Sequence, residues 1–127
     1  MKKKTVLITG GAGYIGSFTV AALKKAGFRP VVFDSLEVGH RQAIPETKLY
    51  VGNLQKDIAL LDKVFKKEKP QAVIHFAAYI EAGESVKDPQ KFFYNNVFGS
   101  LNLFKVMLKN KVLKIVFSSS AAVYGEP

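Results

Sequence analysis

Glycines recur at every third position near the amino terminus, where Thr9 to Gly16 reads Thr-Gly-Gly-Ala-Gly-Tyr-Ile-Gly. A second, overlapping pattern begins at Gly11. Gly10 permits a tight turn, Gly13 lets the backbone approach a pyrophosphate closely, and Gly16 lets the following helix lie against the preceding strand. A pyrophosphate at this turn would bind the positive end of that helix. The spacing therefore indicates a dinucleotide site, although glycines also mark ordinary turns.

An acidic residue, Asp34, ends the next apolar run of the chain. Its carboxylate can accept hydrogen bonds from both hydroxyls of an adenosine ribose, and its charge would repel a 2′-phosphate. This favours NAD over NADP as the cofactor. Arg41 could bind a 2′-phosphate, but it lies beyond a loop and we expect no such role for it. The alternative is that Asp34 only begins a turn.

The elements that must position these residues alternate between strands and helices. An apolar, β-branched run predicts a buried strand from Lys4 to Thr9. Apolar residues then recur at helical spacing and predict a helix from Tyr14 to Lys25. These residues are Ile15, Phe18, Ala22 and Ala26. The other expected elements are strands at Arg29 to Phe33, Lys48 to Val51, Gln71 to Phe76 and Lys114 to Ser118, helices at Ile58 to Lys67 and Pro89 to Asn110, and a connection from Ser35 to Thr47.

This alternation predicts an α/β protein with a three-layer Rossmann fold, in which a parallel sheet of about five strands has the order 3-2-1-4-5. We expect residues 1–127 to form one domain. Ligands of such sheets bind beyond the carboxyl ends of the strands, where the first and fourth strands part. One crevice there would gather Gly10 to Gly16, Asp34, Asn53, Ala77, Ala78 and Ser118 to Ser120.

Composition excludes several classes of function. The chain has no cysteine, and the basic segment Met1 to Lys4 is followed by too short an apolar stretch for a secretion signal, which favours the cytoplasm. No apolar run is long enough to span a membrane. The net charge is +9, but most of the lysines fall on expected outer faces of helices without an arginine-rich stripe, so we expect no nucleic-acid partner. His40 and His75 form no metal cluster and are interpreted as structural.

Six motifs in order and spacing resemble the extended short-chain dehydrogenase/reductase family, and within it the UDP-glucose 4-epimerases. They span the chain and read TGGAGYIGS (Thr9 to Ser17), DSLEVGHR (Asp34 to Arg41), HFAAY (His75 to Tyr79), GES (Gly83 to Ser85), NNVFGS (Asn95 to Ser100) and FSSSAAVYGEP (Phe117 to Pro127). The resemblance implies an NAD-binding domain of an enzyme that interconverts UDP-glucose and UDP-galactose by transient hydride transfer.

The resemblance also implies which residues contact the cofactor. Those expected at the pyrophosphate, the ribose rings, the adenine and along the dinucleotide are Gly10, Gly13, Tyr14, Ile15, Gly16, Asp34, Ser35, Leu36, Asn53, Leu54, Phe76, Ala77, Ala78, Asn95 and Ser118. Two positions depart from the family pattern. Asn53 stands where the family has Asp, and Ile80 stands where many epimerases have Lys.

Ser120 matches the family residue that holds the sugar 4-hydroxyl and relays its proton, and its alternative role is to close the last strand. The family's catalytic Tyr and Lys form a Y-x-x-x-K pair on one helical turn. No tyrosine of this chain has a lysine four residues later: Tyr14, Tyr50, Tyr79 and Tyr94 are followed by Phe18, Leu54, Gly83 and Phe98, and Tyr124 by the end of the sequence. We therefore expect the chain alone to lack epimerase activity and to correspond to the amino-terminal part of the family, without its substrate domain.

Two other functions stay open: a non-catalytic dinucleotide-binding or interaction module, and a fragment of an NAD-dependent sugar-nucleotide dehydratase. The dehydratases carry an Asp-Glu pair near the end of the fifth strand, where this chain reads Ser-Ser-Ser-Ala-Ala from Ser118 to Ala122. The long helix that begins at Pro89 is more apolar than one sheet face requires, so we expect a homo-oligomer.

Overall fold

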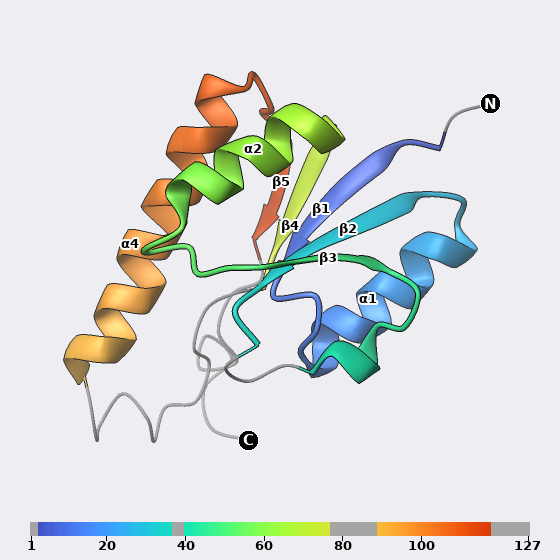
Figure 1. The fold of residues 1–127 in the computed structure, drawn as a ribbon, viewed down its shortest axis with the longest axis horizontal. Helices are drawn as coiled ribbons and strands as arrows, with labels where there is room; N and C mark the ends of the chain where they lie inside the picture. The colour runs from blue at the N-terminus through green and yellow to red at the C-terminus, as the bar shows by residue number, and fades with distance from the viewer. Residues whose placement is uncertain (1–2, 37–39, 77–88, 118–127) are drawn as a thin grey trace.

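The computed structural model describes residues 3–36, 40–76 and 89–117, except for the side chains of Tyr14 and of residues 89–96. Its core is one parallel sheet, whose strands run in the order β3-β2-β1-β4-β5 (Figure 1). The strands are β1 (Thr5–Thr9), β2 (Arg29–Asp34), β3 (Lys48–Val51), β4 (Ala72–His75) and β5 (Ile115–Phe117). The predicted fold class and strand order are confirmed.

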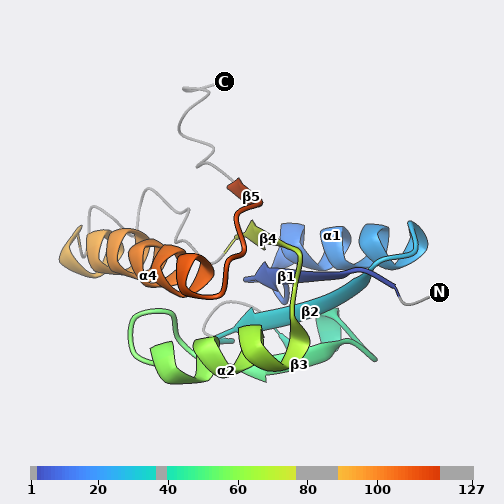
Figure 2. The same ribbon diagram turned by 90° about the horizontal axis from the view of Figure 1, so that it is seen from above.

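Helices cover both faces of the sheet. α1 (Tyr14–Lys25) lies on one face, and α2 (Ile58–Glu68) and α4 (Pro89–Lys109) lie together on the other (Figure 2). The predicted connection after β2 contains a short 3-10 helix, η1 (Arg41–Ala43). The remaining boundaries agree with the prediction to within one residue, and Ser118, expected to end the fifth strand, lies outside the described residues.

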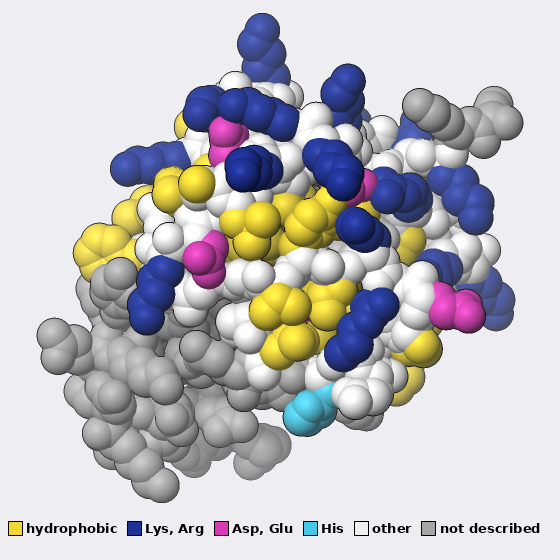
Figure 3. All heavy atoms as spheres, in the orientation of Figure 1, with side chains coloured by type: hydrophobic (Ala, Val, Ile, Leu, Met, Phe, Trp, Pro, Cys, Tyr) yellow, Lys and Arg dark blue, Asp and Glu magenta, His cyan; other side chains and the backbone are white. Residues whose placement is uncertain are grey.

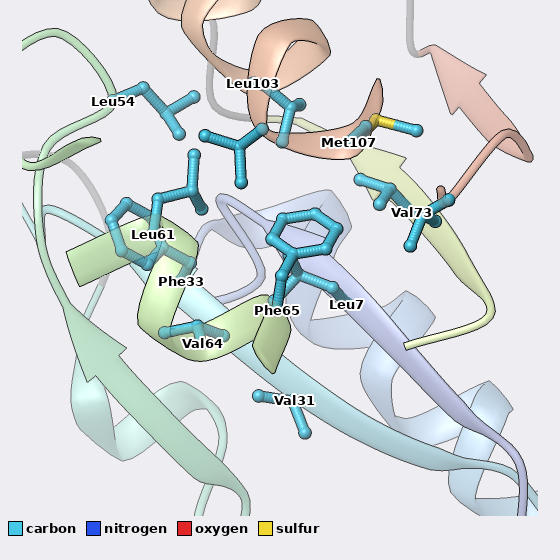
Figure 4. Close-up of a cluster of buried hydrophobic side chains, with 12 residues drawn as sticks. Leu7, Val31, Phe33, Leu54, Leu61, Val64, Phe65, Val73, Leu103 and Met107 are labelled. Atoms are coloured by element: carbon cyan, nitrogen blue, oxygen red, sulfur yellow. The ribbon is translucent and has the colours of Figure 1, made fainter. Parts of the chain in front are cut away.

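The three central strands, β1, β2 and β4, divide their side chains between two cores, because successive residues point to opposite faces. Leu7, Val31 and Val73 pack against α2 and α4, whose Leu61, Phe65 and Leu103 complete that core (Figure 4). Val6, Ile8 and Val32 pack against α1 on the other face. Burial on both faces explains why the strands read as continuous apolar runs in the sequence.

The buried face of α1 differs from the apolar series that predicted the helix. Ile15 and Phe18 are 54% and 64% exposed, and Ala22 and Ala26 are also exposed. The face toward the sheet instead carries Gly16, Val20 and Leu23, which also recur at helical spacing. Because α1 has small or apolar residues around most of its circumference, periodicity predicted the helix and not its orientation.

Glu68, the last residue of α2, joins that helix to β2 by an ion pair and to β3 by a hydrogen bond. Arg29 Nη2 lies 2.7 Å from Glu68 Oε1, and the Tyr50 hydroxyl donates a 2.5 Å hydrogen bond to Glu68 Oε2. Burial acts to raise the pKa of the Glu68 carboxyl, but hydrogen bonds from Tyr50 and Arg29 and the nearby positive charges outweigh it and lower that pKa. Glu68 is therefore ionised in the folded protein at neutral pH.

Basic side chains gather over α2 and the beginnings of the strands on the face shown in Figure 3. Lys66 and Lys67 of α2 are exposed, as are Lys24, Lys25, Lys105 and Lys109 of the other helices, which agrees with the predicted outer faces. None of the helices described by the structure is both long and apolar enough to cross a membrane.

Candidate functional site

The carboxyl ends of the strands bring together segments that are distant in the sequence. Thr9 of β1 pairs with Phe33 of β2 and with His75 of β4. Backbone hydrogen bonds continue one residue beyond this level: Gly10 N donates to Phe33 O at 2.9 Å, and Phe76 N donates to Thr9 O at 2.6 Å. The glycine turn, Asp34 and Phe76 therefore start from one edge of the sheet.

Two glycines of the turn are required by the protein itself. Gly10 has a φ of +80°, a left-handed conformation that side chains rarely adopt. A Cβ on Gly16 would lie 2.4 Å from Gly10 O and 2.7 Å from Gly11 Cα. Both contacts are with backbone, so no rotamer change could relieve them, and Gly16 lets α1 begin directly against the turn.

Gly13 is different, because nothing in the described chain requires a glycine there. Its φ of −77° and ψ of 178° suit any residue, and a Cβ would have one neighbour within 4 Å among the described atoms, Gly10 O at 3.4 Å. As the N-cap of α1, Gly13 offers no side chain to the first N–H groups of the helix, and the first turn contains no acidic residue. The space over Gly13 can thus admit an anion at the positive end of α1.

Asp34 is buried beside this turn, with 7% of its surface exposed. Its Oδ2 accepts a hydrogen bond from Ala12 N at 3.0 Å, and its Oδ1 accepts one from Leu36 N at 2.8 Å. An ionised carboxylate has about four lone-pair sites, so both oxygens keep capacity for ligand hydroxyls. Asp34 is therefore both a brace of the glycine turn and an acceptor at the sheet edge.

Ala12 was missed by the sequence analysis, because its contribution comes from its backbone. Its N–H binds Asp34, and its carbonyl accepts a hydrogen bond from His40 N at 3.1 Å. The connection after β2 is thus tied to the glycine turn on both sides of residues 37–39. No pattern of side chains in the sequence predicts such a backbone contact.

The comparisons with known proteins agree with this geometry. A profile described as the NAD dependent epimerase/dehydratase family matches residues 6–127. The chain belongs to this family. It is 49% identical over 127 residues to a UDP-glucose 4-epimerase of Rhizobium leguminosarum bv. trifolii, covering 100% of this chain and 38% of that protein.

Solved structures give the same result. The UDP-glucose 4-epimerase of Brucella ovis, in complex with NAD, matches with a TM-score of 0.91 and 43% identity, covering 98% of this chain and 38% of that one. The enzyme of Bifidobacterium longum, in complex with NAD+ and UDP, matches with a TM-score of 0.89 and 39% identity, covering 98% and 39%. The predicted resemblance is confirmed, and the chain spans a little over a third of the length of these epimerases.

In this member of the epimerase/dehydratase family, the turn after β3 borders the same edge. Gly52 N donates to Asp34 O at 3.1 Å, which places the following Asn53 next to β2. Asn53 Oδ1 accepts a hydrogen bond from Gln55 N at 2.8 Å, so this side chain also closes a local turn. Leu54 is 5% exposed and packs in the core, which leaves only its backbone for an adenine.

The remaining candidate residues are described to different extents. Ile15 is exposed at the start of α1, Ser35 follows Asp34, and Leu36 and Phe76 pack partly against the α1 core. Tyr14 and Asn95 are placed by their backbones in α1 and α4. Ala77, Ala78, Ser118 and Ser120, together with Ile80, lie outside the described residues.

Among residues 3–36, 40–76 and 89–117, no group of His, Cys, Asp and Glu that could hold a metal ion includes His40 or His75. His40 is exposed next to η1. His75 is 2% exposed, and this burial lowers its pKa to about 4, so its ring is neutral at neutral pH.

Proposed function

We propose that residues 1–127 form an NAD-binding domain, with the pyrophosphate at the glycine turn and the adenosine ribose at Asp34. The observation that carries this proposal concerns Gly13. Neither its backbone conformation nor the described atoms around it require a glycine, whereas the close approach of a ligand would. The pyrophosphate would accept hydrogen bonds from the first N–H groups of α1. The family and the NAD complexes of similar epimerases support the choice of dinucleotide.

The proposal favours NAD over NADP on the charges around the ribose. A 2′-phosphate would be repelled by the buried Asp34 carboxylate. Arg41 is the first arginine or lysine that follows Asp34 in the sequence, but its Nη1 donates to Ile44 O at 3.4 Å and to Thr47 O at 2.6 Å. Its guanidinium closes its own loop, which leaves Asp34 as the charge that faces the ribose.

We further propose that the complete protein acts as a UDP-glucose 4-epimerase. Bound NAD would supply the acceptor and donor of the hydride, and Ser120 would hold the sugar 4-hydroxyl. The Y-x-x-x-K pair that such chemistry needs is not among these 127 residues. The absence of an Asp-Glu pair between Ser118 and Ala122 favours epimerisation over dehydration.

We also propose that the protein is cytoplasmic and self-associates through α4. A chain without cysteine has nothing for an oxidising compartment to pair. On α4, Leu101, Phe104 and Leu108 recur on one stripe and are 49%, 37% and 67% exposed. An apolar stripe of this kind is typical of an interface with a second copy.

Calorimetric titration of the 127-residue chain with NAD and with NADP tests the cofactor proposal. We expect NAD to bind at least about tenfold more tightly, which corresponds to roughly 1.4 kcal/mol. Gly13→Asp should abolish binding of both, because a carboxylate would occupy the phosphate position, whereas Ala21→Asp, exposed on α1, should bind like the native chain. Asp34→Asn keeps an acceptor for Ala12 N and removes the negative charge, so it should reduce the difference in affinity between NAD and NADP. Equal affinity for both cofactors, or a Gly13→Asp variant that still binds, would contradict the proposal.

A further inference from the structure

Three polar side chains are buried directly beneath the proposed cofactor site. Thr9 at the end of β1, His75 at the end of β4 and Ser100 on α4 are 0%, 2% and 7% exposed. His75 Nδ1 lies 2.5 Å from Thr9 Oγ1, and His75 Nε2 lies 3.0 Å from Ser100 Oγ. The imidazole therefore joins two neighbouring strands to the helix that covers them.

The two hydrogen bonds of the ring depend on each other. Because the buried ring is neutral, it carries one N–H, so one nitrogen donates and the other accepts. One of the two hydroxyls must then donate to the ring. None of the described buried side-chain nitrogens and oxygens lacks a hydrogen-bond partner, and His75 provides the partners for the hydroxyls of Thr9 and Ser100.

Each end of this network borders a wall of the crevice. Gly10 and the glycine turn follow Thr9 directly, and Phe76 follows His75. On α4, the neighbours of Ser100 contact the turn after β3: Asn102 Nδ2 donates to Leu54 O at 2.8 Å, and a Cβ on Gly99 would lie 3.2 Å from Leu54 Cβ. The part of α4 that His75 holds is thus also packed against Leu54, one of the residues expected to contact the cofactor.

We propose that His75 is a positioning residue for the dinucleotide, and that its hydrogen bond to Ser100 fixes α4 relative to the glycine turn. The inference rests on the proposed NAD binding and adds a residue that lies beneath the site. It predicts that the link to α4, and not merely the stability of the fold, controls cofactor affinity.

Two substitutions separate the two hydrogen bonds of the ring. The amide of Asn stands as far from Cβ as Nδ1 does, and the amide of Gln as far as Nε2. His75→Asn can therefore keep the bond to Thr9 and lose Ser100, whereas His75→Gln can keep Ser100 and lose Thr9. Each variant leaves one buried hydroxyl unpaired, so both should lower the melting temperature to a similar extent.

Titration with NAD, together with thermal unfolding of each variant, tests the proposal. We expect His75→Asn to bind NAD about tenfold more weakly and His75→Gln to stay within about twofold of the native chain. Ser100→Ala should weaken binding like His75→Asn, and the double variant should be no weaker than either, because both remove the same bond.

The outcomes distinguish this inference from the proposed function. If the native chain does not bind NAD, the proposed function fails, and this inference with it. If the native chain binds and His75→Asn and His75→Gln lose affinity equally, in step with their melting temperatures, His75 is merely structural and only this inference is overturned. Additive losses in the double variant would overturn it as well.

Discussion

Substituting alanine at Gly16 should destabilise the fold, whereas the same change at Gly13 should spare the fold and weaken cofactor binding. At Gly16 the new Cβ would lie 2.4 Å from Gly10 O and 2.7 Å from Gly11 Cα. Carbon atoms pack at roughly 3.5 Å or more, so α1 would have to move away from the turn by about 1 Å. At Gly13 the nearest described atom would be at 3.4 Å, which the turn can accept.

The expected difference in stability follows from two opposing effects. Overpacking costs typically about 1–3 kcal/mol, and the upper end applies here because both contacts are with backbone. Alanine recovers up to about 1 kcal/mol of helix propensity relative to glycine. The net loss for Gly16→Ala is about 2 kcal/mol, which lowers the melting temperature of a domain of this size by roughly 8 °C. Gly13→Ala changes only an N-cap and should cost less than about 1 kcal/mol.

Thermal unfolding followed by circular dichroism, without cofactor, measures the first half of this prediction, and NAD titration measures the second. Gly13→Ala should melt close to the native chain and yet bind NAD more weakly, because its methyl group occupies the path of the pyrophosphate. A Gly13→Ala variant that melts as low as Gly16→Ala, or that binds NAD like the native chain, would refute the division of roles between the two glycines.

Three further predictions concern stability and association. Folding lowers the pKa of His75 from 6.5 to about 4, so the unfolded chain takes up the proton first as pH drops. The free energy of unfolding should therefore decline by about 3 kcal/mol between pH 6.5 and 4. Urea unfolding at several pH values should show a weaker pH dependence of this free energy for His75→Gln. Glu68→Gln should lower the free energy of unfolding by about 1 kcal/mol at pH 7, because it breaks the ion pair with the half-exposed Arg29. The difference in this free energy between the variant and the native chain should shrink in acid, where Glu68 loses its charge. Equal differences at pH 7 and pH 3 would contradict this. In sedimentation experiments, Phe104→Glu should raise the dissociation constant for self-association at least about hundredfold. The control Gln42→Glu, at an exposed position, should leave that constant unchanged. A native chain that stays monomeric at micromolar concentration would exclude an interface through α4.

The fold could be predicted because each element repeats one simple pattern. The three central strands read as apolar runs since both of their faces are covered, and Gly27 follows the end of α1. Alternation then leaves one common arrangement for the sheet. The same reasoning placed the glycine turn and Asp34 at one edge, where the structure has them.

The orientation of α1 could not be predicted by counting apolar residues. Phe18 is larger than each residue of α1 that faces the sheet, and a count of apolar residues favours its side of the helix. The deciding contact is backbone against backbone: the start of α1 approaches Gly10 so closely that only Gly16 can face it. Once that residue is fixed, Val20 and Leu23 follow it onto the sheet at helical spacing.

The network around His75 could not be predicted for a related reason. The sequence shows a histidine in an apolar strand, which indicates burial and hence a polar partner, but it does not show which partner. Ser100 reaches the ring only because α4 is turned so that Gly99 approaches Leu54 and Asn102 binds its carbonyl. The rotation of that helix is a property of the packed fold, and the same rotation sets the wall of the crevice. The residues that tune such a site are therefore found beneath it, at the positions where a buried polar side chain depends on the rotation of a helix.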